Sequence, residues 1–233
     1  MDRIDELVEL YRQREFVISK FLNSVRYFFE NNPALTTGTM PVVHSVKFRL
    51  KDPNHLREKI IRKEEQRKDE GLVITKDNLF SVITDFAGIR ILHIHQQQFP
   101  IIHNEIMQQL ANGDWMLVET PVAYTWDPEC ETFFSGYGIK VKRKESYYTS
   151  VHYLVRPNNS ETGVCCEIQV RTLFEEIWGE IDHTINYPHE TDVLACREEL
   201  RVLAKLISTG SRLADAIFRT YADLQEKGVT KEQ

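Results

Sequence analysis

The spacing of the apolar residues changes twice along this chain. Residues 1–32 carry apolar side chains every three or four positions, and residues 192–227 repeat that pattern, which is typical of amphipathic helices. Between the two stripes, segments such as residues 42–51 alternate apolar and polar side chains, as half-buried strands do. The sequence therefore predicts strands between two long helices, whose stripes pack into the core or, alternatively, against another subunit.

The middle of the chain is expected to alternate between strands and helices. Strands are predicted over residues 42–51, 88–95, 115–125, 147–156 and 164–172. Helices are predicted over residues 100–111 and 173–186 and from Pro53, which Asp52 precedes as an N-cap. Glycine and proline mark residues 126–138 as a mobile loop. No linker divides the chain, so we expect one domain over residues 1–233 with its core at residues 43–187.

Composition excludes several classes of protein. With 42% hydrophobic residues among 233, the chain can bury a core, which excludes disordered and fibrous proteins. No apolar run approaches the roughly 20 residues that cross a bilayer, and the N-terminus lacks the pattern of a secretory signal. We therefore expect a cytoplasmic protein without membrane contact. The cysteines show no C-x-x-C spacing, so neither a zinc site nor disulfides are expected.

Charge is distributed unevenly along the chain. The formal net charge of −6 does not indicate a nucleic-acid partner. Basic residues nevertheless gather between residues 44 and 68 and again at Lys140, Lys142, Arg143 and Lys144. Local cationic surfaces on an acidic protein suit a small polyanion such as a nucleotide.

Alternation sorts the polar residues of three predicted strands onto common faces. These sets are Lys47, Arg49 and Lys51, then Tyr148, Ser150 and His152, then Glu167, Gln169 and Arg171. One such strand is typical of an ordinary amphipathic sheet, but the combination of cations, an aromatic ring, an amide and a carboxylate is typical of a nucleotide site. Glu167 and Asp85, which precedes the strand containing Arg90, are the carboxylates that we expect to hold Mg²⁺ beside phosphates.

Other phosphate and hydrolase chemistries lack their motifs. The chain contains neither a Walker A sequence nor G-x-G-x-x-G, and no glycine-flanked elbow surrounds Ser150. Asp182 and His183 have no partner cluster, so we interpret His183 as a helix-face histidine instead of a metal ligand.

Five motifs are informative because of their order. They are Arg49-x-Lys51 followed by a helix with Lys59, Asp85-Phe86-Ala87-Gly88-Ile89-Arg90, Lys144-x-x-x-Tyr148-x-Ser150-x-His152, Glu167-Ile168-Gln169-Val170-Arg171-Thr172, and Trp178-Gly179-Glu180-Ile181-Asp182-His183 before Tyr187. This set resembles the synthetase domain of the RelA/SpoT family, in particular its single-domain small alarmone synthetases. Neither a hydrolase domain nor C-terminal regulatory domains are expected.

The resemblance implies a fold, an activity and an assembly. The fold is α/β (α+β), a mixed β-sheet flanked by helices and similar to nucleotidyltransferases. The activity is that of a GTP/GDP pyrophosphokinase, which moves the β,γ-diphosphate of ATP to the 3′-hydroxyl of GDP or GTP and yields AMP and ppGpp or pppGpp for the stringent response. The assembly is a homotetramer formed through the terminal helices.

The resemblance also assigns roles to residues of this chain. Arg49 and Arg90 would sandwich adenine, and Lys51, Lys59 and Arg62 would hold the ATP phosphates. Asp85 and Glu167 would be catalytic and hold Mg²⁺, with Glu167 near the 3′-hydroxyl. On the acceptor side, Lys144 would meet phosphates, Tyr148 would stack on guanine, and His152 and Gln169 would position the nucleotide.

Three residues depart from the family pattern and bear on the acceptor. Tyr147 stands where glycine is common, Gly179 where alanine is usual, and Asp182 where glutamate is usual. One alternative is therefore a relative that pyrophosphorylates the 3′ end of tRNA or an adenine nucleotide, although Lys144 with Tyr148 favours a guanine nucleotide. Another alternative is an inactive nucleotide-binding module, against which the presence of both proposed metal ligands argues.

Overall fold

The computed structural model describes residues 2–38, 40–158, 163–187 and 190–226. Within them, seven strands form one sheet in the order β1-β2-β7-β6-β4-β5, and β3 pairs with β6 beside this path. The pairs β2 with β7 and β4 with β5 are parallel, and the remaining pairs are antiparallel. The strands are β1 (Ser45–Leu50), β2 (Ala87–His93), β3 (Trp115–Leu117), β4 (Val122–Thr125), β5 (Lys140–Arg143), β6 (Ser150–Pro157) and β7 (Cys166–Thr172).

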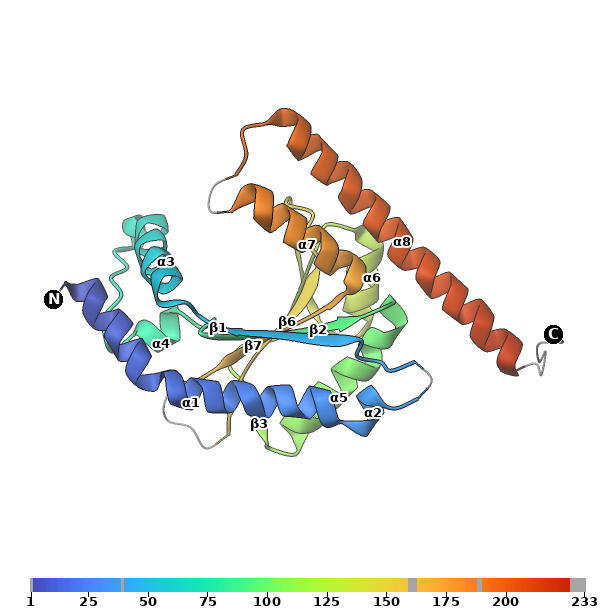
Figure 1. Cartoon of the computed structure of the whole chain (residues 1–233), viewed down its shortest axis with the longest axis horizontal. Coiled ribbons are helices and arrows are strands. Elements are labelled where there is room, and N and C mark those ends of the chain that lie inside the picture. Colours follow the sequence, from blue (N-terminus) through green and yellow to red (C-terminus); the bar gives the residue numbers. More distant parts are fainter. Residues whose placement is uncertain (1, 39, 159–162, 188–189, 227–233) are drawn as a thin grey trace.

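Helices cover both faces of this sheet (Figure 1). α1 and α5 lie on one face, while α7 lies on the other with α8 outside it. The predicted mixed β-sheet flanked by helices is therefore confirmed. None of the helices in the described ranges is long and apolar enough to span a membrane. The helices are α1 (Arg3–Asn31), α2 (Pro33–Thr36), α3 (Pro53–Gln66), η1 (Lys68–Glu70), α4 (Leu79–Val82), η2 (Gln96–Gln98), α5 (Phe99–Ala111), α6 (Pro128–Gly136), α7 (Leu173–Asn186) and α8 (Leu194–Glu226).

α1 contributes its apolar stripe to the core of its own chain. Leu7, Ile18 and Val25 are buried in the main core beneath the sheet. The buried Tyr11 also donates its hydroxyl hydrogen bond to the backbone oxygen of Lys51 at 2.7 Å. α1 thereby holds the backbone just after β1, at the last of the cationic residues Lys47, Arg49 and Lys51. Residue 1 of the predicted helix over residues 1–32 lies outside the described residues.

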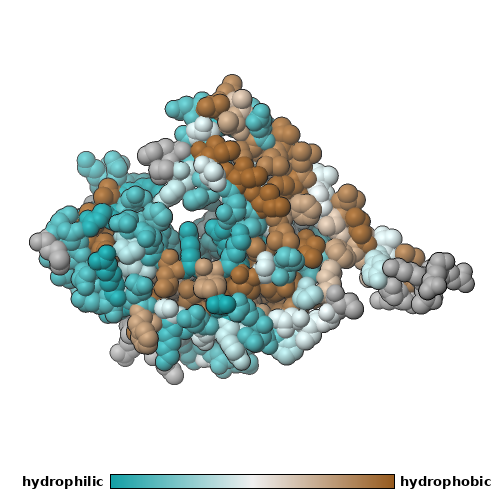
Figure 2. All heavy atoms as spheres, in the orientation of Figure 1, coloured by the Kyte–Doolittle hydropathy of each residue, from teal (hydrophilic) through white to brown (hydrophobic). Residues whose placement is uncertain are grey.

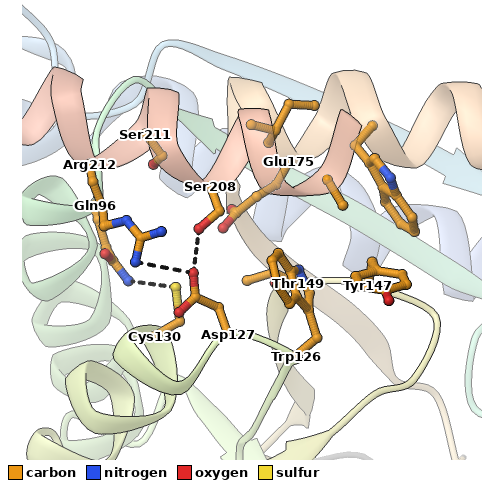
Figure 3. A pocket seen from close by; sticks show the side chains of 13 residues that line it. Gln96, Trp126, Asp127, Cys130, Tyr147, Thr149, Glu175, Ser208, Ser211 and Arg212 are labelled. Carbon is orange, nitrogen blue, oxygen red and sulfur yellow. Dashed lines mark hydrogen bonds and ion pairs between the residues drawn. The ribbon is translucent and has the colours of Figure 1, made fainter. Parts of the chain in front are cut away.

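α8 docks on the rest of the chain through one of its sides. Ala204 and Ile207 pack against Trp178 of α7, and the indole nitrogen of Trp178 donates to the backbone oxygen of Leu200 at 3.0 Å. At the next turns, Asp127 accepts a hydrogen bond from Ser208 and pairs with an arginine of α8 (Figure 3).

The opposite side of α8 carries large apolar side chains that are exposed in the protomer (Figure 2). We call this the outer face of α8, and it consists of Val202, Leu206, Leu213, Ile217 and Tyr221. The two ends of the chain therefore differ, because α1 buries its stripe and α8 leaves most of its stripe uncovered. Residue 227, the last of the predicted helix over residues 192–227, lies outside the described residues.

The mobile loop predicted over residues 126–138 is wrong, because most of this segment is the helix α6. Asp127 caps the helix by accepting from the backbone N–H of Glu129 at 2.9 Å, and Pro128 occupies the first turn. Proline is compatible with that position, where its missing N–H has no helical partner. Phe134 of α6 is buried in the main core, which fixes the helix against the sheet.

The single strand predicted over residues 115–125 is wrong as well. β3 pairs with the second half of β6 and β4 with its first half, and Pro121 between them has no N–H for the ladder. The sequence analysis also missed β5. This edge strand pairs with β4 alone and keeps its lysines exposed, so it lacks the alternation that marks a half-buried strand.

Candidate active site

A cleft with a volume of about 350 Å³ opens on the face of the sheet that α7 covers. Strand register brings distant residues to it, because Arg49 lies opposite Gly88, and Gly88 lies opposite Glu167. The polar faces predicted for separate strands thus form one surface. The cleft is lined by Lys47, Phe48, Arg49, Asp85, Gly88, Arg90, Glu167, Gln169, Glu180 and His183.

Asp85 lies between two lysines on one wall of the cleft. Its Oδ2 is 2.9 Å from Lys51 Nζ and 2.7 Å from Lys59 Nζ, so the end of β1 and the helix α3 meet at this carboxylate. Burial would raise the pKa of Asp85, but the positive charges of Lys59 and Lys51 lower it to about 2. Asp85 is therefore ionised at neutral pH.

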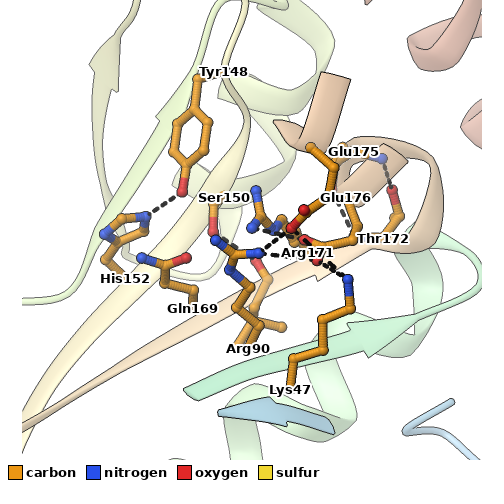
Figure 4. A network of polar contacts seen from close by, with 12 residues as sticks. Lys47, Arg90, Tyr148, Ser150, His152, Gln169, Arg171, Thr172, Glu175 and Glu176 are labelled. Carbon is orange, nitrogen blue, oxygen red and sulfur yellow. Dashed lines mark hydrogen bonds and ion pairs between the residues drawn. The ribbon is translucent and has the colours of Figure 1, made fainter. Parts of the chain in front are cut away.

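Glu167 is held by two polar side chains of the sheet. Its Oε1 accepts from Nδ1–H of His152 at 3.0 Å, and its Oε2 accepts from Nε2–H of Gln169 at 2.8 Å. The other ring nitrogen of His152, Nε2, lies 2.9 Å from the hydroxyl of Tyr148 (Figure 4), which donates to it when Nδ1 carries the ring hydrogen. Burial opposes ionisation of Glu167, but the hydrogen bond from His152 keeps its pKa below the ordinary value.

Glu176 of α7 is the centre of a second group of charges, the Glu176 network (Figure 4). Its carboxylate is only 5% exposed and lies 2.8 Å from Lys47 Nζ, 3.1 Å from Arg90 Nη1 and 2.7 Å from Arg171 Nη2. Glu180, one turn further along the helix, pairs with Arg90 as well. α7 thus presents two carboxylates to the cationic strands β1, β2 and β7.

Lys144 lies at the far end of the sheet, beside Tyr124. Its Nζ is 4.9 Å from the centre of the Tyr124 ring, within the range of a cation–π contact. The same ring meets the edge of His152 with their centres 4.9 Å apart. Tyr124 therefore connects the predicted phosphate-binding lysine to the residues that hold Glu167.

The backbone turns sharply just before β6. Tyr147 has a φ of 60°, in the left-handed region that favours glycine, and its ring packs against Trp126 with centres 5.1 Å apart. Tyr147 therefore has a backbone conformation that glycine would adopt more easily. The strand predicted from residue 147 is wrong at its start, because Tyr148 precedes β6 and reaches His152 from this turn.

The structure brings most of the predicted site residues together. Arg49, Asp85, Arg90, Glu167 and Gln169 line the cleft. Lys51 and Lys59 both contact Asp85. His152 is hydrogen-bonded to Glu167, and Tyr148 is hydrogen-bonded to His152. Lys144 lies beside the ring of Tyr124, which contacts His152. Arg62 is exposed on α3 and is not among the lining residues of the described chain.

Several site residues received no role from the sequence. Lys47 and Arg171 were placed only on polar strand faces, Glu180 appeared only within a motif, and Glu176 and Tyr124 were not singled out. A signal existed for Glu176 and Glu180, because residues four apart share one face of a helix and the predicted cationic strand face offered them a partner. Tyr124 had no comparable signal, since its strand was expected to continue from residue 115.

Asp85 and Glu167, two of the carboxylates that line the cleft, fit a magnesium ion. Asp85 Oδ1 is buried and has no hydrogen-bond partner, so one oxygen is available to a further ligand. Asp85 and Glu167 line the same cleft, and the negative charge of Asp85, together with burial, opposes the lowering of the pKa of Glu167 by His152 and Gln169. No group of three or more metal-ligating side chains exists within the described residues. Mg²⁺ commonly uses one or two protein carboxylates and completes its shell with phosphate and water.

The mixed sheet and its cleft define the class of this protein as an α/β protein that gathers cations and carboxylates on one sheet face. The chain belongs to the RelA/SpoT family, since residues 48–192 match the model described as "Region found in RelA / SpoT proteins". It is similar to the GTP pyrophosphokinase YjbM of Bacillus subtilis (strain 168), with 28% identity over 142 residues. This match covers 61% of the chain and spans only 59% of that relative.

Solved structures share the fold. A GTP pyrophosphokinase family protein from Streptococcus pneumoniae has a TM-score of 0.64 at 19% identity, over 96% of this chain and 95% of that one. The small alarmone synthetase 1 of Bacillus subtilis bound to its product pppGpp has a TM-score of 0.63 at 20% identity, over 93% and 96% of the two chains. The same synthetase bound to AMPCPP has a TM-score of 0.54 at 20% identity, over 95% and 97%.

Proposed function

We propose that the chain is a pyrophosphokinase that transfers the β,γ-diphosphate of ATP to the 3′-hydroxyl of GDP or GTP. The observation that carries this proposal is the arrangement around Asp85 and Glu167. Asp85 is joined to two lysines, and Glu167 is joined to His152 and Gln169. A donor of phosphate and an acceptor of phosphate can therefore bind on two sides of one pair of carboxylates.

The donor side is the part of the cleft formed by β1, β2 and α3. Lys51 and Lys59 would bind the phosphates of ATP, because an ammonium group is a point charge that suits phosphate oxygens. Arg49 and Arg90 would enclose the adenine, and the cleft position of Gly88 next to Arg49 leaves space there. Arg62 would extend the cationic surface along α3 toward solvent.

The acceptor side is formed by β6, β7 and the turn before β6. Tyr148 would stack on guanine, His152 and Gln169 would orient the ribose, and Lys144 would meet the acceptor phosphates. The 3′-oxygen then bonds to the β-phosphorus of ATP while the bond from that phosphorus to the α–β bridging oxygen breaks, and AMP leaves. Glu167 would accept the hydroxyl proton, as an ionised carboxylate beside the nucleophile can.

Asp85 and Glu167 would hold the magnesium ion that we propose as the cofactor. When bound, Mg²⁺ neutralises the charge of the phosphates during transfer. The chain itself contributes alignment of the two nucleotides and fixed positive charge, which are the main requirements of phosphoryl-type transfer. We further propose that the chain acts as one synthetase unit and assembles into a homotetramer through its terminal helices.

The decisive experiment is product identification. Pure protein is incubated with Mg²⁺, ATP labelled at the γ-phosphate, and GDP, GTP, ATP or tRNA in separate reactions. The proposal predicts label in ppGpp with GDP and in pppGpp with GTP, and its loss in Asp85→Asn and Glu167→Gln. Label in tRNA or in an adenine nucleotide alone would establish the alternative acceptors instead. If no acceptor becomes labelled in any reaction while the protein still binds nucleotides, the chain is the inactive binding module.

A further inference from the structure

Arg171 is a buried cation beside the proposed acceptor residue Tyr148. It lies on β7 with 3% of its side chain exposed, and its Nη2 is 2.7 Å from Glu176 Oε2. Its guanidinium carbon is 5.7 Å from the centre of the Tyr148 ring. A planar guanidinium that is buried and paired with a buried carboxylate has little room to move, and an aromatic ring beside it is restricted in turn.

Gly179 leaves the space that the Arg171 guanidinium occupies. A Cβ atom at residue 179 would lie 2.8 Å from Arg171 Nη1, closer than Cβ atoms normally approach other heavy atoms. Gly179 lies inside α7 and is not among the glycines with positive φ in the described chain. The backbone therefore does not require glycine here, but a larger residue would displace the Arg171 guanidinium from its present place.

The contacts of Arg171 form part of a continuous series across the site (Figure 4). On one side, Glu176 also binds Lys47 and Arg90 of the donor strands. On the other side, the Tyr148 hydroxyl donates to His152, which donates to Glu167. The series runs from Arg90 through Glu176, Arg171, Tyr148 and His152 to Glu167.

We propose that Arg171 is a positioning residue for the acceptor nucleotide, with Glu176 and Gly179 fixing its guanidinium and the guanidinium fixing the Tyr148 ring. The proposal rests on the proposed function, in which Tyr148 stacks on guanine. Arg171 is too buried to touch the nucleotide, so it acts through Tyr148. Gly179 thereby contributes to the acceptor site through the space that it leaves for Arg171.

The substitution Gly179→Ala tests this role without removing a charge. The added Cβ displaces the Arg171 guanidinium, and we expect the KM for GDP to rise about tenfold while the KM for ATP and kcat change less than twofold. Gly136→Ala is the matched control, because it adds the same atom at the last residue of the helix α6, where nothing lies within 4 Å. Arg171→Lys keeps the charge but lacks the planar group, and we expect the same selective loss.

A double-mutant cycle separates positioning from general support of the fold. In a Tyr148→Ala background, Gly179→Ala should change GDP affinity, measured by calorimetry, less than twofold. An equal loss in both backgrounds, or equal losses for ATP and GDP, would overturn the proposal. If the wild type makes ppGpp and Gly179→Ala binds GDP normally, only this inference fails. A wild type that binds no guanine nucleotide overturns the proposed function as well.

Discussion

Lys59 Nζ lies 2.7 Å from Asp85 Oδ2, so the lysine proposed to bind phosphate and the carboxylate proposed to bind the metal form an ion pair with each other in the free protein. Lys51 shares the same oxygen at 2.9 Å. Bound ATP would draw both ammonium groups toward its phosphates and release the carboxylate. Binding of the nucleotide and binding of the cation should therefore depend on each other through this one residue.

The first prediction separates the role of Asp85 as a metal ligand from its role as the ion-pair partner of Lys51 and Lys59. Asp85→Asn, like Asp85→Ala and Glu167→Ala, should abolish transfer, since loss of metal neutralisation costs several kcal/mol. In buffer with EDTA, however, Asp85→Asn should bind ATP at least as tightly as the wild type, because Lys51 and Lys59 no longer have an anionic partner. Calorimetry measures this affinity, and Glu167→Gln, which leaves both lysine contacts intact, is the control. Weaker metal-free binding by Asp85→Asn, or turnover within about tenfold of wild type, would contradict the assignment.

The second prediction concerns Tyr148. Tyr148→Ala should weaken the use of guanine nucleotides about ten- to hundredfold, as expected for loss of a stacking contact worth roughly 1 to 3 kcal/mol. Tyr148→Phe keeps the ring and loses only the hydrogen bond to His152, so its activity with guanine nucleotides should fall less than about tenfold. The KM values for GDP and for ATP are measured for both variants. Unchanged kinetics with GDP in Tyr148→Ala would show that the ring is structural.

The parts of the site that lie on regular strands could be predicted from the sequence. Alternation places Arg49 on the cationic face and Glu167 with Gln169 on another, and pairing of those strands brings the faces together. The Glu176 network could not be predicted in the same way. Its members Lys47, Arg171 and Glu176 meet only because α7 crosses back over the sheet, and spacing along one element says nothing about such a crossing.

Local rules also failed where two signals compete. Pro128 suggests a break in the chain, but after Asp127 it starts the helix α6. The lysines of β5 suggest a solvated loop, but they form an edge strand. At Tyr147 the residue type favours an extended backbone, and the turn before β6 imposes a left-handed one. In each case the tertiary contact decides between the signals.

The third prediction uses the strained backbone of Tyr147. An alanine at a positive φ costs about 1 to 2 kcal/mol more than a glycine, whereas glycine is ordinarily the less stable choice by roughly 0.5 to 1 kcal/mol. Tyr147→Gly should therefore be more stable than Tyr147→Ala by about 1 kcal/mol, although both lose the packing on Trp126. Chemical unfolding of the two variants measures the difference. If Tyr147→Ala is the more stable one, the left-handed conformation is not maintained in solution.

The fourth prediction concerns the pH dependence of stability at Glu175 (Figure 3). Thr172 and Glu175 cap α7 reciprocally at 2.7 and 3.2 Å, and burial raises the pKa of Glu175 to about 7. Because this folded-state pKa exceeds the unfolded value of about 4.3, the native state binds the proton more tightly. Protonated Glu175 therefore stabilises the folded state relative to the unfolded state. This contribution is complete below about pH 4.3 and is lost as the pH rises toward 7.

Glu175→Gln keeps the capping oxygen and cannot ionise. Between pH 5 and pH 8 the variant should gain stability relative to wild type by on the order of 2 kcal/mol. Urea unfolding at the two pH values measures this change. Equal differences between variant and wild type at both values would show that Glu175 does not titrate in this range.

The last prediction concerns the outer face of α8. Leu213 and Ile217 are 61% and 57% exposed in the protomer, so replacing both with Asp should change the stability of a single chain by less than about 1 kcal/mol. In the proposed homotetramer the same side chains would be buried, and two unpaired charges would break the contact at a cost of several kcal/mol.

Light scattering should therefore give about four times 27.3 kDa for the intact protein and one chain mass for the variant. Arg219→Asp, which lies two positions beyond Ile217 and so on another side of the helix, should remain assembled. A mass near 27.3 kDa for the intact protein at micromolar concentration would refute the tetramer.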